Sequence, residues 1–166
     1  MIRSILYATD LGLYAPYVLQ HALAMARTFQ AELHVVHAVE PLGLFAESVL
    51  QSYLDAGRLE ELHREGLGTV MASIEARVLE GFRDELGEGQ LDSHLIKTVR
   101  VIEGDPCDVI LAESSSLAVD LLVIGSHSHG ANRNTLMGCT AAKVLQLAEV
   151  PVYLVPMLQH RGQGAC

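Results

Sequence analysis

Five short apolar runs alternate with longer segments of helical spacing, and this alternation constrains the fold more than any other feature of the chain. The apolar runs span residues 2–8, 32–39, 94–102, 120–124 and 150–155. Their content of Val, Ile, Leu and Ala is typical of strands covered on both faces of a parallel sheet. Helical spacing covers residues 14–29, 59–86, 106–117 and 141–148. The alternation predicts one α/β domain: an open, Rossmann-like sheet of five parallel strands with helices on both faces.

Two of the expected helices carry further signals. The apolar side chains that share one face of residues 14–29 are Val18, Ala22, Met25, Ala26 and Phe29. At the start of the helix expected over residues 106–117, Gly104 makes a turn, Asp105 suits the N-cap position and Pro106 suits the first helical turn. That helix is expected to bury Val109, Ile110 and either Ala112 or the neighbours of Glu113.

The predicted domain covers residues 1–157, and residues 158–166 are expected to form a disordered tail. Residues 42–58 fit either a short helix or a flap over a site. The chain has three cysteines, an odd number that argues against a secreted disulfide scaffold. Because the N-terminus also lacks the layout of a signal peptide, we expect a cytoplasmic protein with reduced thiols.

The charge and hydropathy of the chain disfavour two classes of partner. The formal net charge is −9, whereas sequence-independent binding to nucleic acid needs clustered Lys and Arg. No apolar run approaches the roughly 20 residues of a membrane span. We therefore expect neither nucleic-acid nor membrane binding.

Residues 125–140 form a glycine-rich connection between the apolar run at 121–124 and the helical segment at 141–148. Backbone N–H groups in such a connection can face an anion, and the N-terminus of the following helix adds positive potential. The connection therefore predicts a site for the phosphates of a nucleotide.

Five short motifs lie along nearly the whole chain: Ile5-Leu6-Tyr7-Ala8-Thr9-Asp10, His37-Ala38-Val39, Gly104-Asp105-Pro106, Asp120-Leu121-Leu122-Val123-Ile124-Gly125 and Val150-Pro151-Val152-Tyr153-Leu154-Val155-Pro156. Together and in this order they resemble the motifs of the universal stress protein family. The nucleotide motif of that family is G-x2-G-x9-G-[S/T]. In this chain the same spacing gives Gly125, Ser128, Gly138 and Cys139, so the outer glycines match and the other two positions differ.

The resemblance implies a strand order of 3-2-1-4-5 and a homodimer through the last strand, Val150 to Pro156. In the ATP-binding branch of the family it also implies a nucleotide at the carboxyl ends of the first and fourth strands. General rules for open α/β sheets predict the same place, because these strands flank the point where the strand order reverses. The ligand would be ATP, with or without Mg²⁺.

By resemblance, Asp10 reaches the adenosine part of the ligand, while Ala8 and Ala38 line the adenine pocket. From the residues alone, Asp10 could instead cap the next helix, and the two alanines could simply pack in the core. The residues that the resemblance places around the phosphates are Gly125, Ser126, His127, Ser128, Gly138, Cys139 and Thr140. Arg133 could meet a phosphate or remain solvated.

Three functions remain open at this stage. The first is a stress-response regulatory protein that binds an adenine nucleotide and hydrolyses it very slowly at most. The second is a dimeric interaction module of the same family that binds no nucleotide, which Ser128 and Cys139 favour because they replace a glycine and a hydroxyl residue. The third, an ATP-dependent transferase, lacks a suitably spaced nucleophile and base and a complete Walker sequence.

A metal site is not expected. His127 and His129 form an H-x-H pair, but no neighbouring carboxylate or cysteine completes a tetrahedral set in the sequence. His34 and His37 lie three residues apart on an expected strand, so their side chains point to opposite faces.

Overall fold

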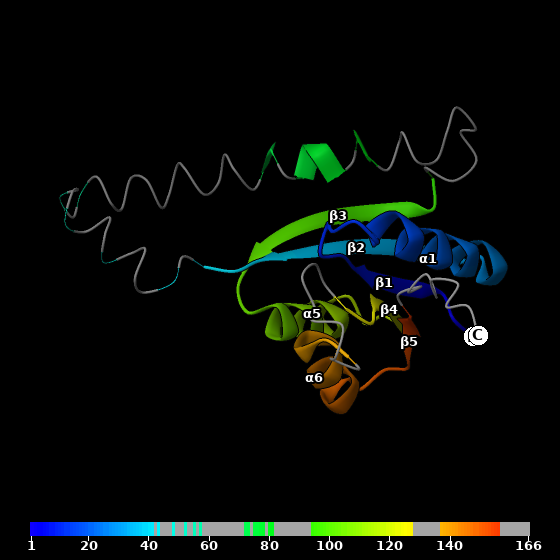
Figure 1. Ribbon diagram of the computed structural model, residues 1–166. Helices are drawn as coiled ribbons and strands as arrows, with labels where there is room; N and C mark the ends of the chain where they lie inside the picture. Colours follow the sequence, from blue (N-terminus) through cyan, green and yellow to red (C-terminus); the bar gives the residue numbers. More distant parts are fainter. Residues whose placement is uncertain are drawn as a thin grey trace, which may run out of the picture.

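The computed structural model describes residues 1–41, 94–127 and 137–156, together with residues 43, 48, 52, 55, 57, 72–73, 75–78 and 80–81. The strands are β1 (Ser4–Ala8), β2 (Glu32–Val39), β3 (Ile96–Glu103), β4 (Leu121–Gly125) and β5 (Val152–Val155). The helices are α1 (Ala15–Phe29), α5 (Pro106–Ser116) and α6 (Cys139–Leu147). Along the described chain a helix follows each of β1, β3 and β4, and β3 is the next element after β2 (Figure 1).

The five strands form one sheet in the order β3-β2-β1-β4-β5, and every pair is parallel. The central strand β1 pairs through Tyr7 with Val35 of β2 on one side and with Val123 of β4 on the other. This confirms the predicted fold class and strand order. Because the order reverses between β1 and β4, the carboxyl ends of these two strands border a crevice.

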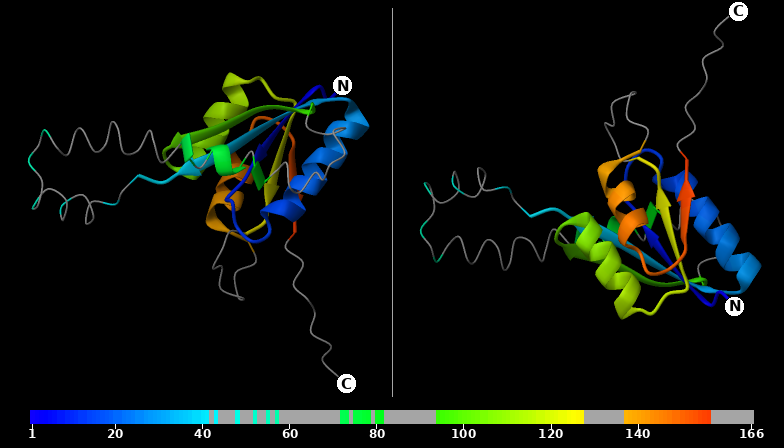
Figure 2. Two further views of the ribbon diagram at one scale, coloured as in Figure 1. Left: turned by 90° about the horizontal axis from the view of Figure 1, so that it is seen from above. Right: turned by 90° about the horizontal axis from the view of Figure 1, so that it is seen from below.

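The alternation of side chains along the strands builds two separate cores. Ile5 and Tyr7 belong to the core beneath α1, whereas Leu6 belongs to the core beneath α5 and α6. Figures 1 and 2 show α1 on one face of the sheet and the other two helices on the opposite face. Such strands are apolar on both sides, which is why their sequences read as continuous apolar runs.

Helix α1 buries most of the face that its spacing predicts. Val18, Ala22 and Ala26 are buried and Met25 is half-buried, whereas Phe29, on the same predicted face, is 40% exposed. Phe29 is the last residue of the helix, where the chain turns away through Gln30 in a left-handed conformation. Its place in the periodic pattern therefore does not bring it onto the sheet.

Helix α5 begins as the sequence predicts. The Asp105 carboxylate accepts hydrogen bonds from the backbone N–H groups of Cys107 and Asp108, which confirms its role as N-cap. Gly104 has φ 155°, and a Cβ atom there would lie 2.8 Å from Cγ2 of Val109. This turn therefore requires glycine both for its backbone conformation and for its close approach to α5.

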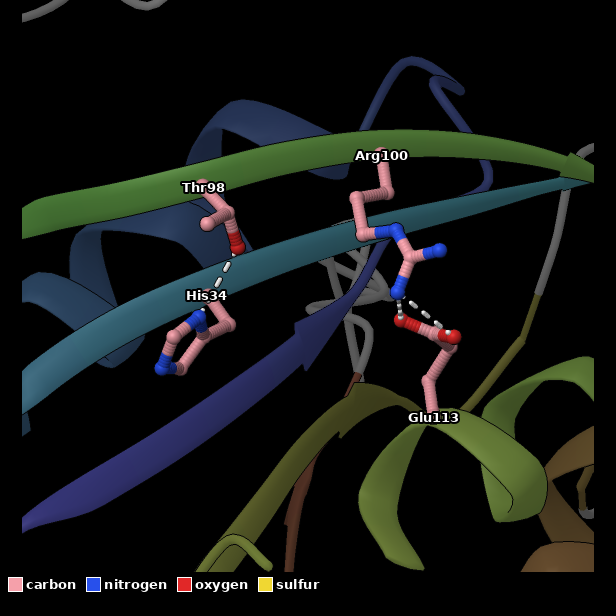
Figure 3. Close-up of polar contacts among 4 residues, drawn as sticks. All are labelled: His34, Thr98, Arg100 and Glu113. Atoms are coloured by element: carbon pink, nitrogen blue, oxygen red, sulfur yellow. Dashed lines mark hydrogen bonds and ion pairs between the residues drawn. The ribbon is translucent and has the colours of Figure 1, made fainter. Parts of the chain in front are cut away.

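The buried face of α5 differs in one respect from the predicted face. Val109 and Ile110 are buried as expected, and of the two alternatives Ala112 is exposed whereas Ser114, a neighbour of Glu113, is buried; Glu113 itself is also buried. Glu113 is tolerated there because Arg100 of β3 reaches both of its carboxylate oxygens, at 3.0 and 2.7 Å. The same face of β2 and β3 carries a hydrogen bond of 2.8 Å between His34 Nδ1 and Thr98 Oγ1 (Figure 3).

The observed strand ends differ by one or two residues from several predicted ends. β5 starts at Val152, so Pro151 precedes the strand, where its carbonyl accepts from the N–H of Leu122. β5 also forms an edge of the sheet. These shifts follow from the pairing register, which the apolar pattern alone does not fix.

Some predictions concern residues that lie outside the described part of the chain. They include the tail at 158–166, nearly all of the segment at 42–58 and most of the helix at 59–86. Within the predicted helix at 59–86, residues 75–78 are helical and Val78 packs into the core beneath α1. In the described residues, no helix has both the length and the apolar character needed to cross a membrane.

Candidate functional site

A cavity of about 720 Å³ lies at the carboxyl ends of β1, β2 and β4. The starts of α1, α5 and α6 complete its wall, so the site occupies the reversal point of the strand order. Its volume falls within the range of about 300–1,000 Å³ that is typical of small-molecule sites. The position and size both suit a nucleotide-sized ligand.

The cavity gathers nine of the ten residues that the sequence analysis predicts as site residues. They are Ala8, Asp10, Ala38, Gly125, Ser126, His127, Gly138, Cys139 and Thr140. The tenth residue, Ser128, lies outside the described residues, as do His129 and Arg133. The described residues come from four separate stretches of the chain, and the parallel sheet brings them to one edge.

Asp10 lies in a tight turn after β1. Its Oδ1 atom accepts a hydrogen bond of 2.9 Å from the N–H of Gly12, and Thr9 Oγ1 accepts one of 3.1 Å from the N–H of Leu11. Leu11 has φ 57°, a left-handed conformation that the two flanking bonds help to hold. The N-cap of α1 is Tyr14 and has no side-chain hydrogen bond, so Asp10 does not cap that helix.

The start of α6 forms another part of the cavity wall. Gly138 is the N-cap and supplies no side-chain hydrogen bond, and Cys139 and Thr140 are the first helical residues. The first N–H groups of a helix have no partner within the helix, and the helix dipole concentrates positive potential there. Because Gly138, Cys139 and Thr140 all line the cavity, this wall is suited to a phosphate group.

The end of β4 also lines the cavity. A Cβ atom on Gly125 would lie 3.3 Å from Cγ2 of Val18, so a larger residue would crowd α1. Ser126 is buried, and its Oγ atom lies 3.0 Å from Nδ1 of His127. The N–H of Gly138 donates to the carbonyl of Ser126 at 2.9 Å, which ties the start of α6 to the end of β4.

Ala8 and Ala38 form a small apolar wall. Both are half-buried and pack against the core beneath α5 and α6, while they also line the cavity. The two proposed roles, core packing and lining the pocket, therefore coexist. Small side chains at these strand ends leave room that larger residues would fill.

Three polar residues of the cavity do not appear among the predicted site residues: Thr9, His37 and Glu40. His37 Nδ1 lies 2.8 Å from the carbonyl oxygen of Thr9, which joins the ends of β1 and β2. A usable signal was present in the sequence, because each of these residues lies at or just after the carboxyl end of a strand, where open α/β sheets bind ligands.

The described lining of the cavity contains the carboxylates of Asp10 and Glu40 but no Lys or Arg. Lys143, the described cation nearest to the motif in sequence, is exposed on α6 and does not line the cavity. Among the residues that the structure places, no group of three or more His, Cys, Asp or Glu side chains could hold a metal ion.

The open parallel sheet and the cavity at its reversal point define a doubly wound α/β protein whose crevice lies where such sheets bind their ligands. The model of the Universal stress protein family matches residues 1–156. The chain belongs to the universal stress protein family.

Two curated relatives extend along nearly the whole chain. Universal stress protein YxiE of Bacillus subtilis is 26% identical over 161 residues, which cover 93% of this chain and 99% of the relative. A universal stress protein of Thermus aquaticus, encoded in the QAH/OAS sulfhydrylase 3' region, is 29% identical over 156 residues, with the same coverage of 93% and 99%.

Solved structures support the fold. The hypothetical protein MJ0577, whose structure was used to assign its biochemical function, has a TM-score of 0.72 at 22% identity and covers 96% of this chain and 99% of its own. A universal stress protein in complex with cAMP has a TM-score of 0.58 at 16% identity and covers 93% and 97%. At these identities the likeness concerns the architecture of the chain.

Proposed function

We propose that this protein is a stress-response regulatory protein that binds an adenine nucleotide, with ATP as the expected ligand, in the cavity between the ends of β1 and β4. The observation that carries the proposal is the convergence of nine motif-derived residues on one nucleotide-sized cavity. A relative crystallised in complex with cAMP supports an adenine nucleotide as the ligand class.

The lining of the cavity combines the two kinds of surface that a nucleotide requires. The half-buried Ala8 and Ala38 offer an apolar surface for the base. The uncapped start of α6 offers backbone N–H groups and the Thr140 hydroxyl to a phosphate. Asp10, directly after β1, lines the same cavity, and the resemblance assigns it to the adenosine part. We expect ATP hydrolysis to be very slow at most, because the sequence has no complete Walker motif.

A second candidate function is a dimeric interaction module that binds no nucleotide. Ser128 and Cys139 favour it, because they replace a glycine and a hydroxyl residue of the nucleotide motif. If the middle position needs φ above zero, Ser128 costs about 1 kcal/mol or more. This candidate predicts that Ser128→Gly creates binding or greatly improves it.

Both candidates include a homodimer through the edge strand β5. An unpaired apolar edge strand is prone to association, and pairing with a second copy about a two-fold axis would satisfy it. Light scattering at micromolar concentration should therefore give twice the mass of the chain. A monomer would contradict this part of the proposal.

A thermal-shift panel separates the two functions. ATP, ADP, AMP and cAMP at millimolar concentration, each with and without Mg²⁺, should raise the Tm of the wild-type protein if it binds nucleotide, because a ligand stabilises the state that it binds. If the wild type gives no shift and Ser128→Gly does, the interaction module is the better description. A wild type that already binds tightly, with no gain in the variant, rules that module out.

A further inference from the structure

We infer that the outer edge of β5 binds a second copy of this chain in one defined register, with the two-fold axis at Tyr153, so that Val152 of each copy pairs with Leu154 of the other. This inference rests on the dimer of the proposed function. It adds to that dimer the residues that pair and the side chain that lies on the axis.

The hydrogen bonds on the inner side of β5, an edge strand of the sheet (Figure 2), show which of its backbone groups point outward. The carbonyls of Pro151 and Val155 accept hydrogen bonds of 3.0 and 2.8 Å from N–H groups of β4 and of the residue that follows it. The pairing of the two strands runs from Val152 to Val155 without a shift. In a parallel ladder, residues that bond the neighbouring strand alternate with residues that point away from it. The outward-pointing residues of β5 are therefore Val152 and Leu154.

Two outward residues that flank one inward residue form a self-complementary pattern. When a second β5 lies antiparallel about a two-fold axis at Tyr153, Val152 faces Leu154 of the second copy, and Leu154 faces Val152. Residues that face each other in this way exchange both of their N–H···O=C bonds. Every outward N–H and C=O group of β5 then has a partner within the other β5.

Registers that are shifted along the strand lack this property. With the axis at Leu154, Val152 faces Pro156 of the second copy, which has no N–H to donate. With the axis at Val152, Leu154 faces Val150, which lies outside β5. The axis at Tyr153 is therefore the register that pairs β5 with β5 throughout.

The side chains of the edge suit a second copy. Residues 150–156 contain no charged side chain, so two such edges meet without repulsion between like charges, although each chain carries a net charge of −9. Val152 and Leu154 are half-buried against the core beneath α5 and α6, and a second strand would cover their exposed parts. β5 has none of the charged residues that protect edge strands from pairing.

Tyr153 is held in place on the other face of the sheet. Its hydroxyl oxygen lies 3.1 Å from Nδ1 of His21, and the two ring centroids are 5.8 Å apart. The His21 ring in turn meets the Tyr17 ring edge-on, with centroids 4.8 Å apart. Across an axis at Tyr153 the two tyrosines are directly opposed in a pair without backbone hydrogen bonds, where side chains approach most closely. His21 is therefore a positioning residue for an aromatic contact on the axis.

Disulfide cross-linking tests the register. Cys139→Ser and Cys166→Ser are introduced first, so that an added cysteine is the only thiol besides Cys107, which is buried. On this background Tyr153→Cys should form a covalent dimer when it is oxidised with diamide. The Cα atoms of a directly opposed pair of this kind lie about 4.5 Å apart, within the range of about 4.4–6.8 Å that disulfides span.

Val152→Cys and Leu154→Cys are the matched controls. In the inferred register each of these positions is diagonal to its own copy, roughly 7–8 Å away, which is too far for a disulfide. Each protein alone should therefore form little covalent dimer. When the two proteins are mixed and allowed to exchange subunits, a disulfide between Val152→Cys and Leu154→Cys should form, and a non-reducing gel measures all of these products.

The affinity of the dimer gives a second measurement that needs no cysteine. Tyr153→Ala removes the aromatic contact on the axis and should raise the Kd of the dimer roughly two- to tenfold in sedimentation experiments. Tyr153→Phe keeps the ring and should retain most of the affinity. A Tyr153→Ala protein that dimerises as tightly as the wild type would place the tyrosine away from the axis and overturn the inference.

Each outcome of the cross-linking has one meaning. If Val152→Cys or Leu154→Cys alone cross-links better than Tyr153→Cys, the axis lies at another residue and the inferred register is wrong, while the dimer stands. If the wild type is a dimer and none of the variants cross-links, the second copy does not pair with β5 as inferred. A monomeric wild type in light scattering would leave β5 to an unlike strand, so that the proposed dimer fails and the inference fails with it. Unfolding curves show whether the variants are folded under the same conditions.

Discussion

At the scale of single residues, Gly104 is the position where the fold tolerates the least change. Its φ of 155° and the 2.8 Å approach to Val109 Cγ2 both exclude a side chain, and Val109 is a stiff, buried neighbour. Gly104→Ala should lower the free energy of unfolding by about 1–3 kcal/mol. Gly43→Ala is the control, because a Cβ atom there meets nothing within 4 Å. Urea denaturation checks both, and equal stabilities would refute this reading of the turn.

The ion pair between Arg100 and Glu113 should contribute more than an exposed pair does. Arg100→Met leaves the Glu113 side chain, which is 10% exposed, without its partner. We expect a loss of about 1–3 kcal/mol in the free energy of unfolding. Lys97 and Glu32 form a matched exposed pair at 3.2 Å, with both side chains more than half exposed, so Lys97→Met should cost only about 0–1 kcal/mol. Similar losses in the two variants would show that burial of Glu113 is unimportant.

His34 should make the stability depend on pH. Burial lowers the pKa of His34, so the unfolded chain binds a proton more readily than the folded chain does. The stabilising contribution is therefore complete above the unfolded pKa of about 6.5 and is lost as the pH falls through the lower folded value. Urea denaturation between pH 8 and pH 5 should show this loss, and His34→Gln should reduce it. His21→Gln is the control, and an unchanged pH dependence in His34→Gln would contradict the assignment.

At the scale of elements, the apolar pattern of the sequence was sufficient to predict the sheet but not the polar contacts between its elements. Continuous apolar runs such as Leu121–Ile124 identify buried parallel strands, and the N-cap at Asp105 has a strong local signal. The pair of Arg100 with Glu113 depends on how β3 and α5 pack together across the sheet, which no local pattern encodes. Asp10 was open to two interpretations for the same reason, since only the observed turn shows that its carboxylate binds Gly12 and does not cap α1.

The start of α6 gives a prediction for one element of the site. Cys139 occupies the position of a hydroxyl residue in the family motif and is exposed at the cavity wall. Cys139→Ser introduces a stronger hydrogen-bond donor and should tighten nucleotide binding roughly three- to tenfold. Cys139→Ala removes the weak thiol donor and should bind about as the wild type does. Calorimetry compares the three proteins, and a serine variant that binds no better than alanine would exclude a hydroxyl contact with the phosphates.

At the scale of the whole molecule, the strand order brings motifs that are far apart in the sequence together at one cavity. Asp10, His37, Gly125 and Cys139 belong to four different stretches of the chain, and each lies at a strand end or helix start on the same edge of the sheet. The general rule for open α/β sheets predicted this edge, and nine of the residues that the resemblance named line the cavity there. Thr9, His37 and Glu40 were missed because the resemblance assigned no role to them.

The most direct test of the central claim is a calorimetric titration of ATP with MgCl₂ into the wild-type protein and into Cys139→Trp. The indole would fill the cavity from an exposed position, so the fold should be retained. We expect saturable binding to the wild type with one nucleotide per chain, and no binding to the variant. An absence of heat with the wild type at millimolar ATP, or equal binding to both proteins, would contradict the claim that this cavity holds the nucleotide.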